Sequence, residues 1–118
     1  MGKKKVKRVR SRIITGAFST AGSLSSGVIG SVVKREMGGI KYCYEKGLKK
    51  NPKLSGKIVI EFLIGVNGSV RSSRVVFSSM GAPSVERCIA RRVTRFRFPK
   101  PKKGSVKVNY PFIFTSGS

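Results

Sequence analysis

Histidine, aspartate and tryptophan are all missing from this chain of 118 residues, and only four residues are acidic. Without His or Asp, the chain cannot build a Ser-His-Asp triad, a carboxylate–imidazole pair or the usual zinc-ligand sets. The four acids are scattered and form no paired acid/base pattern: Glu36, Glu45, Glu61 and Glu86. We therefore expect a binding domain and not an enzyme, with no catalytic residues, no metal site and no cofactor.

Long apolar runs are missing as well. No stretch approaches the roughly 20 apolar residues that a membrane-spanning helix requires. The basic start followed by residues 13–18 imitates a signal peptide, but polar residues and a glycine interrupt the apolar run between Thr15 and Thr20. We expect a soluble domain whose export signal or membrane anchor belongs to a longer parent protein.

Positive charge is what the chain has in excess, since 26 Lys and Arg against four acids give a net charge of +22. We predict that residues 1–12 form a flexible basic arm that contacts anionic surfaces through Lys3, Lys4, Lys5, Lys7, Arg8, Arg10 and Arg12. The charge suits nucleic acid, anionic lipid headgroups or acidic cell-wall polymers. Charge alone does not choose among these partners.

The length fits one domain, which we place at residues 13–115, with a short tail at 116–118. Apolar periodicity predicts a helix from Val28 to about Leu48, strands over 57–64 and 69–78 around an Asn67-Gly68 turn, a helix beginning at Pro83 and a strand over 106–114. A break in the pattern near Ser72-Ser73 indicates a β-bulge. Residues 13–22 are compatible with an extra strand in front. The prediction is an α+β domain, with two helices packed on a small antiparallel sheet in the order α-β-β-α-β.

The last strand is the candidate partner-binding edge. Its residues alternate between an apolar face and a mixed face: Val106, Val108, Tyr110, Phe112 and Phe114 against Lys107, Asn109, Pro111 and Ile113. A proline within a strand cannot donate to the hydrogen-bond ladder, which favours an edge position. An exposed edge can pair with an extended segment of a partner, or with a second copy to give a homodimer. We predict this edge to be open unless the N-terminal strand covers it.

Seven sequence motifs, spread over most of the chain, point to a family. They are Ile40-Lys41-Tyr42-Cys43-Tyr44-Glu45-Lys46-Gly47-Leu48, Asn51-Pro52-Lys53-Leu54-Ser55-Gly56-Lys57, Ile64-Gly65-Val66-Asn67-Gly68-Ser69-Val70, Ser78-Ser79, Val85-Glu86-Arg87-Cys88, Phe96-Arg97-Phe98-Pro99-Lys100-Pro101 and Val108-Asn109-Tyr110-Pro111-Phe112-Ile113-Phe114. Over residues 24–114 the chain resembles the AgmX/PglI C-terminal domain family, within the wider TonB C-terminal group. It departs from that family in its large positive charge and in Phe96, where many relatives have Trp.

The resemblance implies a mechanical function. Domains of this group lie in the periplasm at the C-terminal end of an inner-membrane-anchored parent, grip an outer-membrane or periplasmic protein, and transmit force derived from the proton-motive force. AgmX/PglI-type proteins are associated with gliding motility and cell-envelope machinery. Strand addition at residues 106–114 is the expected mode of protein binding.

Two cysteines, Cys43 and Cys88, lie beside or within the apolar stripes of the two predicted helices. They are compatible with two buried, unpaired thiols that pack as small hydrophobes. They are also compatible with a disulfide between the helices, which an oxidising compartment permits. Because the resemblance implies the periplasm, the disulfide is the favoured interpretation.

The alternative function is a small basic nucleic-acid-binding module. It would use the basic arm and the arginines of the second helix, Arg87, Arg91, Arg92, Arg95 and Arg97, with a base-stacking platform at Phe96, Phe98, Tyr110, Phe112 and Phe114. A solvated helix face and a buried aromatic core explain the same residues more simply.

Overall fold

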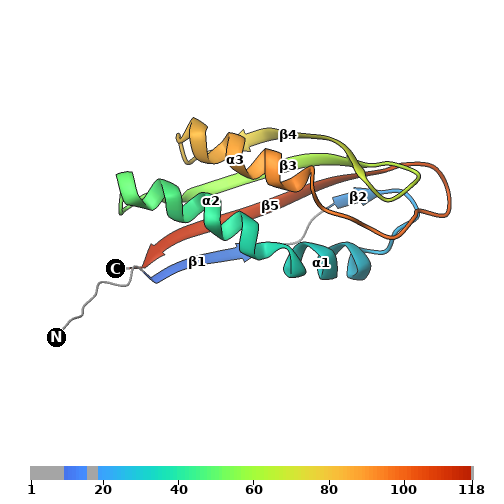
Figure 1. The fold of residues 1–118 in the computed structure, drawn as a ribbon, viewed down its shortest axis with the longest axis horizontal. Helices are drawn as coiled ribbons and strands as arrows, with labels where there is room; N and C mark the ends of the chain where they lie inside the picture. The colour runs from blue at the N-terminus through green and yellow to red at the C-terminus, as the bar shows by residue number, and fades with distance from the viewer. Residues whose placement is uncertain (1–9, 16–18, 118) are drawn as a thin grey trace.

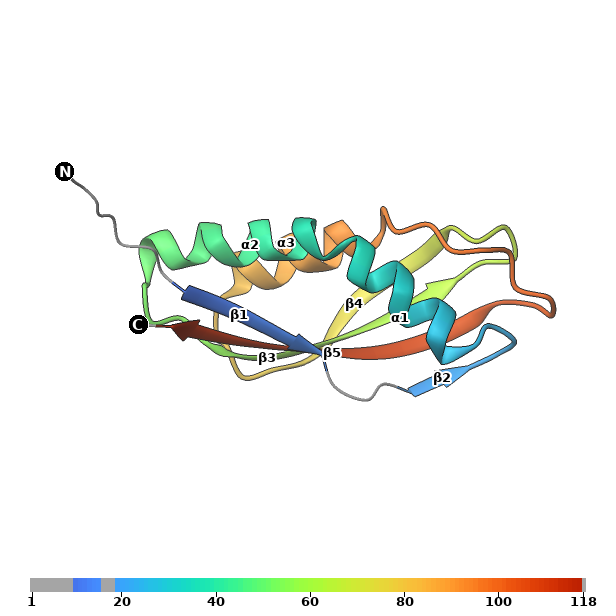
Figure 2. The ribbon, with the colours of Figure 1, turned by 90° about the horizontal axis from the view of Figure 1, so that it is seen from below.

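The computed structural model describes residues 10–15 and 19–117. Within these residues, α1 (Ser26–Arg35), α2 (Met37–Lys50) and α3 (Pro83–Val93) cover one face of an antiparallel sheet (Figures 1 and 2). The strands are β1 (Arg10–Thr15), β2 (Ser19–Ala21), β3 (Gly56–Ile64), β4 (Val70–Ser78) and β5 (Val106–Gly117). They lie in the order β1-β5-β3-β4, and β2 also pairs β5. The predicted α+β class is confirmed.

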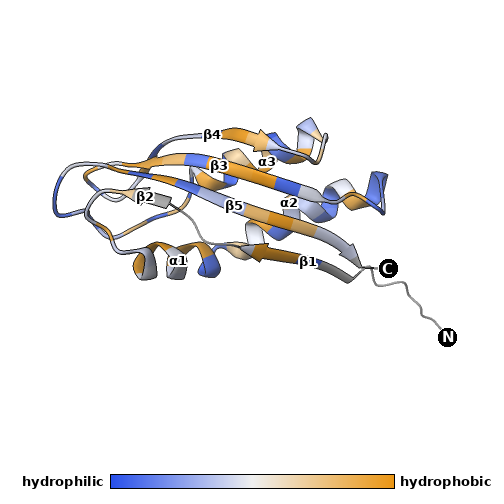
Figure 3. Ribbon diagram, turned by 180° about the vertical axis from the view of Figure 1, so that it is seen from behind, coloured by the Kyte–Doolittle hydropathy of each residue, from blue (hydrophilic) through white to orange (hydrophobic). Residues whose placement is uncertain are grey.

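Alternation along the strands gives the sheet one buried face. The side chains that β3 and β5 turn toward the helices are Ile58, Ile60, Phe62 and Ile64, and Val106, Val108, Tyr110, Phe112 and Phe114. The helices contribute Ile29, Val32 and Val33 from α1, Ile40, Cys43, Tyr44 and Leu48 from α2, and Val85, Ile89 and Val93 from α3. Figure 3 shows the sheet from its other side. Burial of these apolar side chains is the main term that stabilises the domain.

The single helix predicted over residues 28–48 is in fact two helices. Glu36 separates α1 from α2, with φ −94° and ψ 7°. Gly38 and Gly39 follow after Met37, and each lowers helix propensity by about 1 kcal/mol relative to Ala, so the helical run is weakest near this point. The bend lets α1 lie near β2 while α2 packs beside α3 (Figure 2).

The hairpin between β3 and β4 turns at the predicted Asn67-Gly68 pair. Gly68 has φ +89°, a region that side-chain-bearing residues rarely adopt. The backbone N–H of Phe98 also donates to the Gly68 carbonyl at 2.9 Å. A Cβ added at Gly68 would lie only 2.0 Å from the Phe98 carbonyl oxygen. Glycine is therefore required both by the turn and by the segment that packs against it.

Candidate functional site

The strand predicted as the partner-binding edge lies inside the sheet. β5 pairs β3 from Val106 opposite Ile64 to Phe114 opposite Gly56. On its other side, residues 112–117 pair β1 and residues 107–109 pair β2. The prediction of an open edge at residues 106–114 is therefore wrong, because the N-terminal strands occupy that side.

Pro111, which favoured an edge position in the sequence, lies inside the sheet. β1 ends opposite Phe112 and β2 begins opposite Asn109, so Pro111 falls between the residues that pair these two strands. On its other side Pro111 lies opposite Val59 of β3. Pro111 therefore does not mark an edge of the sheet.

The open edge on the opposite side of the sheet is β4. Among the described residues, β4 pairs β3 and no second strand. Its pairing shifts twice, leaving Arg71 and Val76 as the extra residues, so the bulge predicted near Ser72-Ser73 lies next to that position and a second one follows. Bulges of this kind twist an edge and limit non-specific pairing.

β4 also carries apolar side chains that solvent reaches. Val76 is 42% exposed and Phe77 is 51% exposed. The ammonium of Lys57 lies 5.9 Å from the centroid of the Phe77 ring. Nearby, the guanidinium of Arg74 on β4 forms an ion pair with the carboxylate of Glu61 on β3, with 2.9 Å between nitrogen and oxygen. β4 therefore combines an unpaired backbone edge with two exposed apolar groups.

The cysteines form the expected disulfide. Cys43 of α2 and Cys88 of α3 are bonded, with their Cα atoms 5.6 Å apart. Gly47, one turn further along α2, lets the helices approach closely, since an added Cβ would meet a Val85 methyl at 2.5 Å. The sequence placed both cysteines on helices, and the packing of α2 against α3 brings them together.

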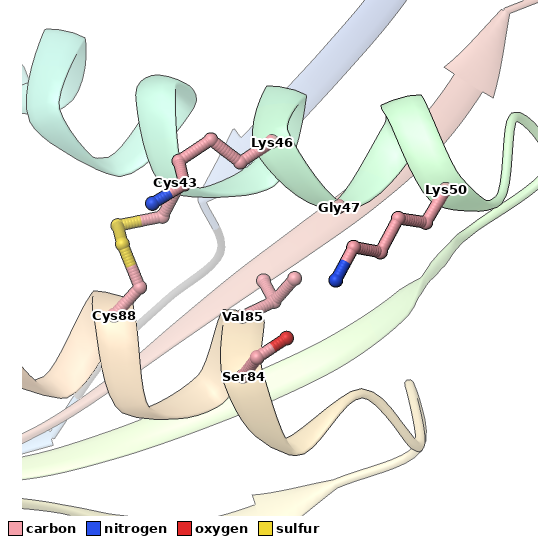
Figure 4. Close-up of a pocket in the computed structure, with 7 residues that line it drawn as sticks. All are labelled: Cys43, Lys46, Gly47, Lys50, Ser84, Val85 and Cys88. Carbon is pink, nitrogen blue, oxygen red and sulfur yellow. A yellow bond between two sulfur atoms is a disulfide. The ribbon is translucent and has the colours of Figure 1, made fainter.

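A hollow of about 190 Å³ lies beside the disulfide, between α2 and α3 (Figure 4). It is lined by Cys43, Lys46, Gly47 and Lys50 of α2 and by Ser84, Val85 and Cys88 of α3. Lys46 runs back along α2 toward the disulfide, while the Lys50 ammonium turns toward α3 (Figure 4). Two lysines thus overhang a hollow that the sequence did not reveal.

The predicted contacts of the basic arm fall into two groups. Lys3, Lys4, Lys5, Lys7 and Arg8 lie outside the described residues. Arg10 and Arg12 belong to β1, opposite Gly117 and Thr115, and are not part of an unstructured arm. The folded domain thus reaches from Arg10 to Gly117, further at both ends than the predicted 13–115.

The aromatic residues considered as a base-stacking platform are buried. Phe96, Phe98, Tyr110, Phe112 and Phe114 are each at most 6% exposed. Their rings contact one another and Phe62 within the core, for example with Phe62 and Phe98 stacked at 5.8 Å between centroids. The core interpretation is confirmed, and these rings are not available to nucleic-acid bases.

Tyr44 is the described residue whose titration is clearly perturbed. Its hydroxyl donates a hydrogen bond to the Leu54 carbonyl in the core. Desolvation by burial raises the pKa of Tyr44 above its ordinary value of 10.0. The described residues include no cluster of three or more His, Cys, Asp or Glu side chains that could hold a metal ion. Across the same part of the chain, every helix is too short or too polar to span a bilayer.

Comparison of the chain with protein-family models, with curated proteins and with solved structures gives no match. The resemblance to the AgmX/PglI family and to the TonB C-terminal group therefore rests on the sequence motifs and stays a prediction.

Proposed function

We propose that this chain is a non-catalytic protein-binding domain of a TonB-like envelope machine and holds its partner by β-strand addition. The observation that carries the proposal is the open edge of β4, beside the exposed side chains of Val76 and Phe77. Unpaired N–H and C=O groups of an edge strand give affinity, and neighbouring side chains give specificity. The motifs shared with the TonB group support a partner in the outer membrane or periplasm.

The edge in this proposal is β4 and no longer residues 106–114. β5 already has strands on both sides, so a partner could pair there only after displacing β1 or β2. β4 accepts a strand without such a displacement. The surrounding positive charge favours an extended segment that carries acidic residues.

The periplasmic location is part of the same proposal. The disulfide between Cys43 and Cys88 supports it, because disulfides persist in oxidising compartments and are rare in the cytosol. Force transmission and a role in gliding or related envelope machinery follow from the resemblance alone.

The test is site-specific photo-crosslinking in intact cells that make the full chain. A photoreactive residue at Phe77 should give protein adducts, whereas one at Val66, in the hairpin turn and 62% exposed, should give few. Amide exchange should slow along β4 when the crosslinked partner, once identified, is added. Equal adducts at both positions, or no protection of β4, would contradict strand addition at this edge. A crosslinked homodimer would assign the edge to self-association.

A further inference from the structure

The helix layer carries a second surface of unusual composition. The first hollow adjoins another of about 170 Å³ on the far side of the disulfide, and Lys46 and Cys88 line both. The second hollow is lined by Tyr42, Lys46, Cys88, Arg91, Arg92 and Arg95. We call the two hollows together the α2–α3 groove. Five cationic side chains line it, and no carboxylate does.

The cations of the groove have no ionic partner among the described residues. The ion pairs of the described residues join Lys41 to Glu45, and Glu61 to Arg74 and Lys107, and none of these side chains lines the groove. The carboxylate of Glu86, on α3, accepts hydrogen bonds from the Ser78 hydroxyl and the Ala82 N–H. The positive charge of the groove is therefore balanced by solvent ions or by a ligand.

The helix spacing makes this arrangement costly for the free protein. Lys46 and Lys50 lie four residues apart on α2, and Arg91 and Arg95 lie four residues apart on or just after α3. Like charges at this spacing repel one another on a helix surface. An anion bound between the helices would remove that repulsion, so the groove is built to favour a negative ligand.

Tyr42 indicates which kind of anion fits. It is 51% exposed, and its ring lies 5.4 Å from the Lys46 ammonium and 5.3 Å from the Arg92 guanidinium. Tyrosine, with an apolar ring and a polar hydroxyl, is enriched where proteins meet the level of lipid headgroups. A base-stacking site needs exposed ring faces, and this ring already has two cations against it. Arginine forks also match phosphate oxygens bidentately.

We propose that the α2–α3 groove binds the phosphate group of an anionic phospholipid headgroup. Arg91, Arg92 and Arg95 donate to the phosphate oxygens, with Lys46 between the two hollows and Tyr42 at the lipid interface. This site lies between α2 and α3 and no residue of β4 lines it, so it does not depend on the proposed strand addition. It holds the domain against a membrane surface.

The experiment compares two variants of the full chain that lose the same charge. The groove variant is K46Q/R91Q/R95Q, and the control variant is R35Q/K53Q/R97Q. All six side chains are exposed, so both variants should fold and keep the disulfide, as circular dichroism and thiol alkylation can check. Binding is measured at low salt by co-sedimentation with vesicles of phosphatidylcholine, with and without phosphatidylglycerol.

Lysine or arginine near an anionic surface contributes about 1 kcal/mol each, so the groove variant should bind phosphatidylglycerol vesicles roughly 100-fold more weakly than the wild type. The control variant should lose only a small part of that effect. Wild-type binding should also require phosphatidylglycerol.

Other outcomes would overturn the proposal. Equal losses of vesicle binding in the groove and control variants would mean that the overall positive charge of the protein, and not the groove, attracts the vesicles. Equally strong binding to pure phosphatidylcholine vesicles, whose phosphate is neutralised by the choline cation, would show that the groove does not require an anionic headgroup. Binding of duplex DNA that depends on the groove, without vesicle binding, would assign the groove to nucleic acid. Glycerol phosphate that binds as tightly as the vesicles would assign it to a small soluble phosphate.

Discussion

Reduction of the Cys43–Cys88 disulfide should lower the free energy of unfolding by about 4 kcal/mol. The bond closes a loop between residues 45 apart in the sequence, and the chain-entropy relation for a loop of that length gives this magnitude at 25 °C. The effect arises mainly in the unfolded chain, because the native packing of α2 against α3 keeps both sulfur atoms in place. For a domain of this size, 4 kcal/mol is a large part of the total stability.

Urea unfolding with and without reductant measures this difference directly. The reduced protein should unfold at lower urea, with a larger slope of free energy against denaturant because its unfolded state is more expanded. The double variant Cys43→Ala/Cys88→Ser is the control, since its stability should not respond to reductant. The alanine suits the buried Cys43, which is 1% exposed, and the serine suits the half-buried Cys88. Two thiols that alkylate in unreduced protein, or an unchanged midpoint on reduction, would refute the reasoning.

Three further substitutions test the fold. Gly68→Ala should destabilise the protein by about 3 kcal/mol or more in urea unfolding, because its Cβ meets the Phe98 carbonyl. The control Gly81→Ala, at φ +66° with open space around it, should cost only about 1 kcal/mol. Similar losses in the two variants would contradict the packing role of Gly68. Tyr44→Phe should cost about 1–2 kcal/mol at neutral pH, because a core carbonyl loses its donor. Because the pKa of Tyr44 is raised in the folded protein, the stabilisation that its protonated hydroxyl provides is complete below about pH 10 and is lost as pH rises through the folded-state pKa. The stability difference between wild type and Tyr44→Phe should therefore shrink in alkali. A constant difference would exclude this linkage. Glu86→Ala should lower the thermal midpoint by an amount equivalent to about 1–2 kcal/mol, because the Ala82 N–H at the start of α3 loses its acceptor. An unchanged midpoint would show that this hydrogen bond is energetically neutral.

Local features of the sequence predicted most of the elements. The Asn67-Gly68 turn depends on the backbone of those residues, and α3 begins at Pro83 because a proline fits the first helical turn. The alternation along β5 also predicted its buried face correctly. In each case the determining interaction lies within a few residues of the signal, so the sequence was sufficient.

Features that depend on distant segments were harder to predict. Pro111 favoured an edge position, but the pairing register places it inside the sheet, between the residues of β5 that pair β1 and those that pair β2. The break at Glu36 depends on where α1 and α2 pack, although Gly38 and Gly39 gave a warning. The α2–α3 groove was missed because Tyr42 and Arg92 lie far apart in the sequence and meet only across the helix pair. The arginines of α3, taken alone, indicated nothing more than a solvated face.

The disulfide and the groove are physically connected. No lysine or arginine is buried among the described residues, so the cations of this part of the chain lie at least partly in solvent. Where α2 and α3 run side by side, their lysines and arginines repel one another and favour separation of the helices. The bond between Cys43 and Cys88 joins the two helices at the place where the two hollows meet, because Cys88 lines both. A covalent link there holds the cations in position before any anion arrives, so the ligand does not have to supply the free energy of assembling its own site.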